Sequence, residues 1–246
     1  MFSFFKKSSD TPKIVDFSFI GTDIHSHLIP GIDDGCASIE HSVACIQKLK
    51  ELGFSKIITT PHIMAEVYPN TPEIINEGLT ILKAALVEAG IDIEIEVGAE
   101  YKIDEQFTGL LETDNLLTFG DKYILVEFSF VAAPINLETI IFNLRTKGYR
   151  PIIAHPERYL YLSENLAKFE ELKALGCHLQ LNLMSLVNQY GPKANEIANK
   201  LLDMNLYEFM GTDLHRPDDV RILNKLLQSK SILNKLSKLR HLNEKV

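Results

Sequence analysis

Four glycines punctuate this chain, and each separates a helical pattern from a short apolar run. Gly53, Gly90, Gly148 and Gly176 each follow a segment whose apolar residues have helical spacing, and a run rich in Ile, Val or Leu starts a few residues later. Glycine is favoured just past a helix because it accepts a left-handed backbone. The repetition of helix, glycine and strand predicts βα units, in which strands are parallel and crossovers are right-handed.

Apolar patterns predict seven strands and seven helices. The predicted strands are residues 18–24, 56–60, 92–98, 122–128, 151–154, 178–182 and 207–211. The predicted helices are residues 38–52, 72–89, 103–112, 136–147, 164–175, 192–204 and 217–229, the first with Ser38 as its N-cap. Seven strands without a second core favour an α/β fold of the distorted (β/α)7, TIM-like barrel type, and a doubly wound open sheet is the alternative.

We expect one catalytic domain over residues 19–246, because a chain of 246 residues suits a single barrel. Residues 1–18 are predicted to be an N-terminal arm or a poorly ordered lead. Phe2, Phe4 and Phe5 give that arm an apolar side that could contact another surface.

Composition narrows the classes of partner. The net charge of −8 disfavours nucleic acid and membrane surfaces as the main partners, since both favour clustered Lys and Arg. No apolar stretch approaches the ~18 residues of a membrane span. The three cysteines form no C-x-x-C pair, which favours a reduced, cytoplasmic setting. The oligomeric state is left open by the sequence.

Side chains of the types that bind metals gather at the predicted strand ends. The groups are Asp23-Ile24-His25-Ser26-His27, Asp33-Asp34, Thr60-Pro61-His62, Gly98-Ala99-Glu100, Ala154-His155-Pro156-Glu157-Arg158 and Thr212-Asp213-Leu214-His215. In a (β/α) barrel the C-terminal ends of the strands share one rim, so these groups would meet there. Mixed imidazole and carboxylate sets suit Zn, Fe or Mn. The pattern predicts a multinuclear metal site.

Local spacing supports this interpretation for five residues. His25 and His27 are two positions apart, so in an extended segment both imidazoles point to one side and can face one metal. Asp213 and His215 have the same spacing. Glu100 directly follows a strand, and a carboxylate has two oxygens with which to bridge two metals.

Three aspartates have competing interpretations. Asp33 and Asp34 lie in the run 31–35 (GIDDG), which is also turn chemistry, so one of the two could serve only to shape the loop. Asp23 would point away from His25 in a regular strand, so we expect it behind the metal site or as a weak ligand.

Two arginines are candidates for binding phosphate. Arg158 closely follows His155 in a loop that should overhang the rim, and its planar guanidinium matches a phosphate group. A surface salt bridge of Arg158 with Glu157 or Glu164 is the alternative. Arg216, directly after His215, is a weaker candidate of the same kind.

The order H-x-H, T-P-H, G-A-E, A-H-P-E-R and D-x-H resembles the polymerase-and-histidinol-phosphatase (PHP) superfamily. More narrowly, residues 23–35 (DIHSHLIPGIDDG) and 154–159 (AHPERY) are similar to the bacterial PHP-type protein-tyrosine phosphatases of capsule and exopolysaccharide operons. The resemblance covers about residues 20 to 230. The lead before the first motif is longer than in Gram-positive members, and residues 63–71 beside the site are not diagnostic.

The resemblance implies a PHP-type barrel that holds a trinuclear divalent metal site, often manganese, with iron or zinc as alternatives. The ligands it implies are His25, His27, Asp34, His62, Glu100, His155, Asp213 and His215. It implies that Arg158 grips the phosphate, with Arg216 as a second clamp. The implied substrate is the phosphotyrosine tail of a membrane-bound tyrosine autokinase, attacked by a hydroxide that bridges two metals. A metal-bound water, or His62 released from coordination, could then act as the general acid.

Three rival functions remain open to different degrees. A small-molecule phosphatase, such as histidinol-phosphate phosphatase, comes from the same superfamily. A non-catalytic PHP scaffold would lack ligands, and none of the expected positions is vacant. A thiol-based phosphatase needs an arginine six positions after its cysteine. The residues six positions after Cys36, Cys45 and Cys177 are Ser42, Glu51 and Leu183, so this class is disfavoured.

Overall fold

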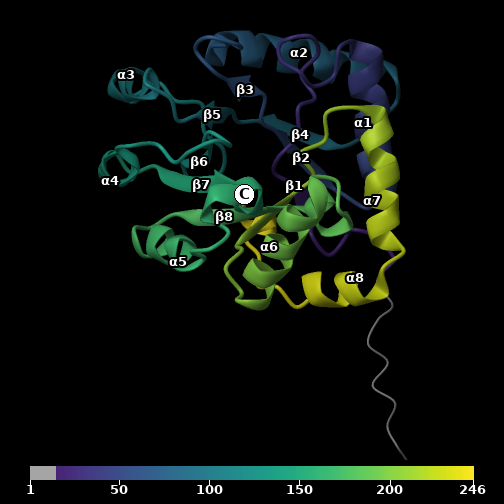
Figure 1. Cartoon of the computed structure of the whole chain (residues 1–246). Coiled ribbons are helices and arrows are strands. Elements are labelled where there is room, and N and C mark those ends of the chain that lie inside the picture. Colours follow the sequence, from purple (N-terminus) through teal and green to yellow (C-terminus); the bar gives the residue numbers. More distant parts are fainter. Residues whose placement is uncertain (1–14) are drawn as a thin grey trace, which may run out of the picture.

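The chain folds into short parallel strands with helices packed around them (Figure 1). The computed structural model describes residues 15–246. Its strands are β1 (Thr22–Asp23), β2 (Lys56–Thr59), β3 (His62–Ile63), β4 (Glu94–Val97), β5 (Glu100–Lys102), β6 (Tyr123–Glu127), β7 (Arg150–Ala154), β8 (His178–Asn182) and β9 (Phe209–Gly211). Its α-helices are α1 (Ile39–Glu51), α2 (Pro72–Glu88), α3 (Phe107–Thr113), α4 (Leu137–Thr146), α5 (Ala167–Ala174), α6 (Gly191–Asp203), α7 (Val220–Leu227) and α8 (Lys230–Leu236). Short 3-10 turns are η1 (Pro156–Arg158), η2 (Leu160–Leu162), η3 (Leu183–Val187), η4 (Pro217–Asp219) and η5 (Asn243–Lys245).

The strands form two parallel sheets whose order follows the chain. One sheet has the order β1-β2-β4, and the other has the order β3-β5-β6-β7-β8-β9. The α/β class and the parallel pairing are therefore as predicted. The predicted strands 56–60 and 92–98 correspond to β2 and β4, but each is followed after a break by a short strand that was not predicted, β3 and β5. The first sheet ends where Thr59 pairs with Val97, and the second begins where His62 pairs with Glu100. Pro61 lies in the interruption and has no N–H to donate.

In a closed barrel, hydrogen bonds would join the strands into one continuous ring. Among residues 15–246 the strand pairing does not form such a ring. Isolated contacts instead span the seam between β1 and β9. Ser26 and Leu214 form a single parallel bridge. Further along the seam, the Asp23 carboxylate accepts hydrogen bonds from the Thr212 N–H (2.9 Å) and hydroxyl (2.7 Å).

The other end of the seam is held by Asn243 of η5. Its amide nitrogen donates to the carbonyls of Thr22 (2.8 Å) and Met210 (2.7 Å), and its amide oxygen accepts from the Met210 N–H (3.0 Å). One buried side chain thus connects the backbones of β1 and β9.

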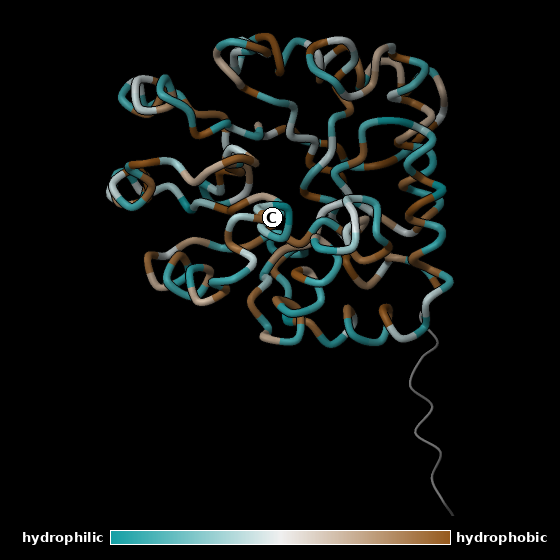
Figure 2. The backbone as a smooth tube through the Cα atoms, in the orientation of Figure 1, coloured by the Kyte–Doolittle hydropathy of each residue, from teal (hydrophilic) through white to brown (hydrophobic). Residues whose placement is uncertain are grey.

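Side chains alternate along the strands between two hydrophobic cores. Ile58, Leu125 and Ile152 belong to an inner cluster, which Leu242 and Val246 at the C-terminus also contact. Their neighbours along the strands, such as Ile57 and Ile153, belong to the larger cluster under the helices. This period of two is the geometry of a strand buried on both faces. Figure 2 shows hydrophobic and hydrophilic stretches alternating along the surrounding helices, as expected for helices with one buried side.

Most helices begin and end near the predicted residues. Ser38 caps α1 by accepting from the His41 N–H, and all four predicted glycines have positive φ. The predicted helix 217–229 is instead η4 followed by α7, because the turn at Pro217–Asp219 is 3-10. Helix α8 was not predicted. The predicted helix 103–112 begins only at Phe107, where Asp104 accepts from its N–H (3.0 Å).

The predicted arm falls largely on residues 1–14, so the prediction for Phe2, Phe4 and Phe5 lies outside the described residues. Packing already begins before residue 19, because Phe17 is buried against Phe54, with ring centroids 5.5 Å apart. Within residues 15–246, no helix is both long and apolar enough to cross a membrane.

Candidate metal centre and phosphate site

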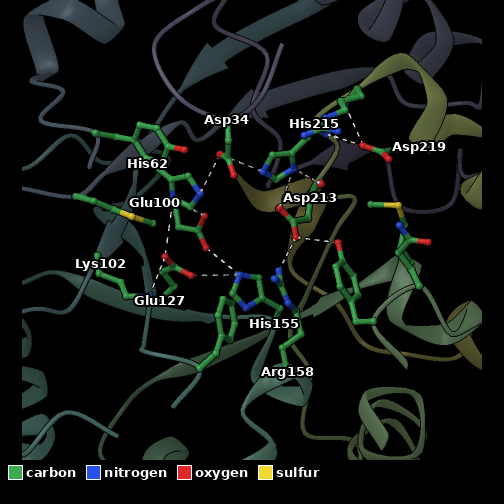
Figure 3. Close-up of a pocket in the computed structure, with 17 residues that line it drawn as sticks. Asp34, His62, Glu100, Lys102, Glu127, His155, Arg158, Asp213, His215 and Asp219 are labelled. Carbon is green, nitrogen blue, oxygen red and sulfur yellow. Dashed lines mark hydrogen bonds and ion pairs between the residues drawn. The ribbon is translucent and has the colours of Figure 1, made fainter. Parts of the chain in front are cut away.

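A cavity of about 410 Å³ opens where the parallel strands end, and six of the eight predicted ligand residues line it, while His25 and His27 are buried (Figure 3). His62 and Glu100 come from β3 and β5, and His155 directly follows β7. Asp213 and His215 follow β9. Functional side chains collect at the C-terminal ends of parallel strands, which we call the strand-end rule. Here it applies to side chains that are far apart in the sequence.

Glu100 lies at the centre of this group. Its Oε1 is 3.0 Å from His155 Nε2. Its Oε2 is 3.3 Å from His25 Nε2, 3.4 Å from His27 Nε2 and 3.2 Å from His62 Nδ1. Burial alone would raise the pKa of Glu100, but the imidazoles of His25 and His62 hold that pKa well below its usual range. The carboxylate is therefore ionised, and it faces four ring nitrogens.

Asp213 is a second shared carboxylate. Its Oδ1 is 3.3 Å from His25 Nε2, 3.4 Å from His27 Nε2 and 3.6 Å from His215 Nδ1. Its Oδ2 faces the other way, toward Arg158. Burial opposes ionisation here too, yet the surrounding imidazoles hold the pKa of Asp213 well below its usual range.

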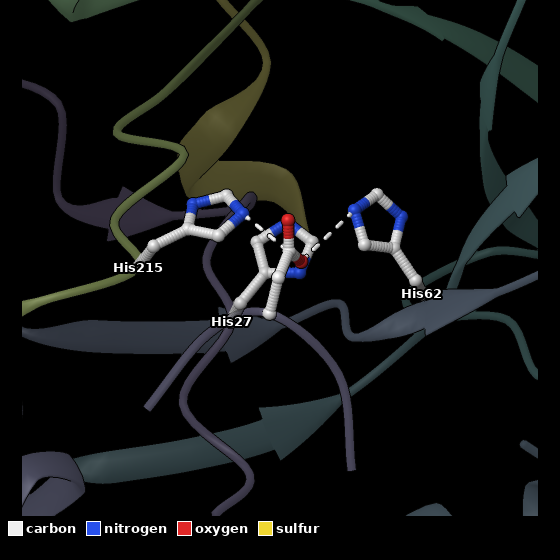
Figure 4. A group of neighbouring side chains, drawn as sticks. His27, His62 and His215 are labelled. Atoms are coloured by element: carbon white, nitrogen blue, oxygen red, sulfur yellow. Dashed lines mark ion pairs between the residues drawn. The ribbon is translucent and has the colours of Figure 1, made fainter. Parts of the chain in front are cut away.

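Asp34 completes a more open group at the mouth of the cavity. Its Oδ1 is 3.5 Å from His62 Nε2 and 3.6 Å from His215 Nε2. Figure 4 shows the rings of His62 and His215 on either side of His27. Asp34 is half-exposed, whereas His27 is fully buried.

The donor set fits divalent metal ions. Three groups of residues offer ring nitrogens and carboxylate oxygens to a metal, and within each group these atoms all lie within 4.8 Å of one another. The groups are His27, Asp34, His62 and His215; His25, Glu100 and His155; and His25, His27 and Asp213. Within the described residues, His62 Nδ1 and Glu100 Oε2 are buried without a hydrogen-bond partner. Buried polar atoms without partners are costly, and a coordinated cation would remove that cost.

Partners behind the imidazoles hold the rings in place. Asp33 Oδ2 is 2.9 Å from His27 Nδ1 and also accepts from the His62 N–H (3.0 Å). His27 keeps the pKa of Asp33 well below its usual range despite burial. Gln180 Oε1 is 2.9 Å from His25 Nδ1. Such partners fix the ring orientation and leave the other nitrogen free for a metal. Asp23 lies farther back and bonds Thr212, as described for the seam.

Two of the predicted ligand residues occupy strained backbone conformations. His155 has φ of 33° and Asp213 has φ of 53°, in the left-handed region that residues other than glycine seldom adopt. The surrounding contacts hold both turns, and such strain is typical of functional sites.

Arg158 lies against the same cavity between two aromatic rings. Its guanidinium carbon is 4.5 Å from the Phe130 ring centroid and 4.3 Å from that of Tyr190. Its Nη1 donates to Asp213 Oδ2 (3.0 Å). The alternative surface salt bridge with Glu157 or Glu164 is not formed; Glu157 is buried and accepts from the Ser185 hydroxyl instead. Arg216 lies exposed at the rim of the cavity.

Sequence reasoning missed four cavity-side residues. Glu127 ends β6. Its burial, and to a smaller degree the negative charge of the nearby Glu100, raise the pKa of Glu127 to about 7. Lys102 ends β5 and donates to Glu127 Oε1 (3.2 Å). Asn182 ends β8, and it donates to Asp213 Oδ2 (2.7 Å), as does the Tyr190 hydroxyl (3.2 Å). Applied to the predicted strand 178–182, the strand-end rule would have identified Asn182, whereas Lys102 ends a strand that was not predicted and Glu127 lay inside the predicted strand 122–128. Tyr190, on the loop after η3, had no such signal.

Comparison with known proteins places this geometry in a family. The family model described as "Capsular polysaccharide synthesis, CpsB/CapC" matches residues 21–238. The chain belongs to the CpsB/CapC family. The family match spans every predicted ligand position, from His25 to His215.

Similar members of the CpsB/CapC family are named as phosphatases. "Tyrosine-protein phosphatase YwqE" of Bacillus subtilis (strain 168) is 33% identical over 194 residues, covering 78% of this chain and 76% of that protein. "Tyrosine-protein phosphatase CpsB" of Streptococcus pneumoniae is 30% identical over 202 residues, covering 80% and 83%. "Putative tyrosine-protein phosphatase CapC" of Staphylococcus aureus is 29% identical over 194 residues, covering 78% and 76%.

A solved structure in the CpsB/CapC family has the same fold. It comes from work on YwqE of Bacillus subtilis and CpsB of Streptococcus pneumoniae, described as "unique metal-dependent tyrosine phosphatases". The TM-score is 0.74 at 30% sequence identity, and the match covers 90% of this chain and 94% of the other. The predicted family resemblance and α/β fold are confirmed.

Proposed function

We propose that this chain is a metal-dependent protein-tyrosine phosphatase, a phosphomonoesterase that acts on tyrosine-phosphorylated protein in capsular or exopolysaccharide synthesis. The observation that carries the proposal is the pair of shared carboxylates, Glu100 and Asp213, each facing several imidazoles beside Arg158 in one cavity. The family and the names of its members support the same reaction.

The proposed ligands are His25, His27, Asp34, His62, Glu100, His155, Asp213 and His215. Three divalent ions are the proposed stoichiometry, with manganese preferred and iron or zinc compatible with the same ligands. The three donor groups overlap at His25 and His27, and each of these imidazole nitrogens would bind only one ion. Bound ions of this kind lower the pKa of water to give a nucleophile at neutral pH, and they offset negative charge on phosphoryl oxygens.

Arg158 orients the phosphate. Its Nη1 is held by Asp213, and the two aromatic rings limit the motion of the guanidinium plane. A guanidinium fixed before the substrate arrives can donate to phosphoryl oxygens without reorganising during the reaction. Arg216 at the rim is proposed as a second, more mobile clamp.

The leaving group needs little help from the protein. The phenol of tyrosine has a pKa of about 10, so it leaves more readily than a serine alkoxide. Burial lowers the pKa of His62 to about 4, which suits a neutral metal ligand better than the general acid considered from the sequence. Tyr68 and Phe130 line the cavity and offer aromatic walls to a phenyl ring.

The proposed partner is the phosphotyrosine tail of a membrane-bound tyrosine autokinase, which this protein would meet in the cytoplasm. The support is the family's link to capsular polysaccharide synthesis and the half-open cavity, which a protruding tyrosine side chain can enter.

Metal removal and paired variants test the proposed function. A chelator should abolish hydrolysis of a phosphotyrosine peptide and added Mn²⁺ should restore it, whereas thiol alkylation should have no effect. His155→Ala should lose metal and rate together, while Arg158→Ala should lose rate but retain metal, measured by elemental analysis. Activity that survives exhaustive metal removal would refute the mechanism. A higher kcat/KM for histidinol phosphate than for the peptide would favour the small-molecule alternative.

A further inference from the structure

The loop between β6 and α4, residues 128–136, separates the catalytic cavity from a second one. Phe130 lines the catalytic cavity. Its neighbours Ser129 and Val131 line the second cavity, which has a volume of about 620 Å³. The chain bends at residues 130–132, and neighbouring residues of this bend line different cavities, so the bend forms a shared wall. A chain bound in the first cavity therefore passes directly beside the second.

The second cavity presents apolar side chains to solvent. Val131 is 86% exposed and Ile135 is 100% exposed, while Ile103 and Ile140 form its buried base. Exposed apolar residues that line a concave surface are typical of binding sites, whereas single scattered ones are ordinary.

The charge beside this cavity has one sign. Asp104 and Glu105 are among its lining residues, which include no lysine or arginine. The Asp104 carboxylate also accepts from the N–H groups of Gln106 (2.9 Å) and Phe107 (3.0 Å), so it is held in place. A ligand with a positive charge next to an apolar side chain matches this surface, and an acidic ligand does not.

We propose that the second cavity binds an apolar side chain of the phosphotyrosine-bearing polypeptide, with a basic residue favoured beside it. The proposal rests on the proposed phosphatase function and adds a determinant of substrate choice. Because the two cavities share the wall formed by residues 129–131, the apolar residue should lie close to the phosphotyrosine in the sequence of the bound polypeptide.

Peptides and a small aryl phosphate separate this inference from the reaction itself. A series of phosphotyrosine peptides would carry one Leu moved through the flanking positions of a Ser-rich sequence, each with Lys or Glu beside the Leu. We expect kcat/KM about 10-fold higher for the best Leu–Lys peptide than for its all-Ser counterpart, as one apolar side chain in a pocket provides. p-Nitrophenyl phosphate has no flanking residues and occupies only the catalytic cavity, so its kcat/KM reports the reaction without the second cavity.

Val131→Asp and Ile135→Asp test the cavity directly. Both variants should lose the preference for the Leu–Lys peptide and keep the wild-type kcat/KM for p-nitrophenyl phosphate. Val87→Asp on α2 is the matched control, because Val87 is 81% exposed and lies outside this cavity. It should leave both activities unchanged.

Three results would overturn the proposal. The first is a wild-type enzyme that hydrolyses the Leu–Lys and all-Ser peptides equally well. The second is a loop variant that retains the preference. The third is a loop variant whose only change is its oligomeric state in analytical ultracentrifugation, which would assign the apolar loop to a second copy of this chain. If the wild-type enzyme did not hydrolyse p-nitrophenyl phosphate at all, that result would instead count against the proposed function.

Discussion

Arg158 combines two kinds of restraint on one side chain. Asp213 fixes one nitrogen of the guanidinium, and the rings of Phe130 and Tyr190 restrain its plane from two sides. Lysine carries the same charge but has neither the planar fork nor the flat surface that stacks on aromatic rings.

We therefore expect Arg158→Lys to lower kcat for a phosphotyrosine peptide by roughly 100-fold, the usual effect of losing one preorganised donor to a phosphoryl or oxyanion group. Steady-state kinetics measure the rate, and elemental analysis measures the bound metal, which should be unchanged. Arg216→Lys is the control, with a smaller expected effect because Arg216 is exposed. Loss of metal from Arg158→Lys would mean that Arg158 acts by holding Asp213 and not on the phosphate.

Asp33 contacts His27, a proposed metal ligand, from the side away from the cavity. Asp33→Asn removes the negative charge that faces His27 Nδ1 at 2.9 Å, while its amide oxygen can still accept from the Gly35 N–H. We expect metal affinity to fall about 10- to 100-fold, which is typical when the partner of a coordinating imidazole is changed. Competition with a chelating dye measures this affinity. Asp218→Asn, at an exposed carboxylate paired with Arg221, should have no effect. Equal affinities for the two variants would contradict the role of Asp33.

At the scale of elements, the turn η1 depends on one buried carboxyl group. Glu157 Oε1 accepts from the Asn182 N–H (3.0 Å) and the Ser185 hydroxyl (2.8 Å), and its Oε2 accepts from the Tyr207 hydroxyl (3.0 Å). Glu157 thereby ties η1, which carries Arg158, to the end of β8 and to η3.

Burial raises the pKa of Glu157 from 4.5 to about 7. The folded state therefore binds this proton more tightly, so the stability it contributes is fully present below about pH 4.5 and is lost as the pH rises through about 7. Relative to Glu157→Gln, the wild type should lose up to about 3 kcal/mol of unfolding free energy over that range. Urea titrations at a series of pH values measure the difference. Parallel pH profiles for the two proteins would contradict it.

The sequence predicts some elements well because their signals are local. Runs of β-branched residues mark the strands, and ligand-type residues at their ends mark the rim. The interruption at Pro61 depends on pairing between neighbouring strands, which no single run reveals. Helix α8 has only seven residues, too few for a clear helical period. Glu127 lay inside a predicted strand, so its place at the end of β6 was not distinguished.

At the scale of the whole molecule, the position of Tyr190 shows what remains beyond prediction. Tyr190 reaches Asp213 only because the loop after η3 folds back over the rim. The seam is of the same kind: Asn243 is near the C-terminus, yet it bonds the backbone of Thr22 at the start of the fold. Neither contact has a local signal, since both depend on how distant segments are packed.

Asn243 is expected to be important for global stability. Asn243→Ala leaves the N–H and carbonyl of Met210 and the carbonyl of Thr22 without these partners in a buried setting. We expect a loss of about 3 kcal/mol of unfolding free energy, as for removal of a buried hydrogen-bonding group. Urea unfolding measures it. Asn76→Ala is the control, because Asn76 makes only an exposed bond to Pro72 within α2. Equal stabilities would mean that the seam does not depend on Asn243.

The same seam joins residues that are translated at very different times. His25 and His27 are translated well before Asp213, the carboxylate that both imidazoles face and one of the proposed ligands. Asp23 and Thr212, which meet across the seam, are 189 positions apart. A nascent chain that stops before β9 therefore lacks one of the two carboxylates that the imidazoles share. The proposed metal centre can therefore be completed only after β9 and the residues that follow it have been made, and we expect products that terminate earlier to be inactive.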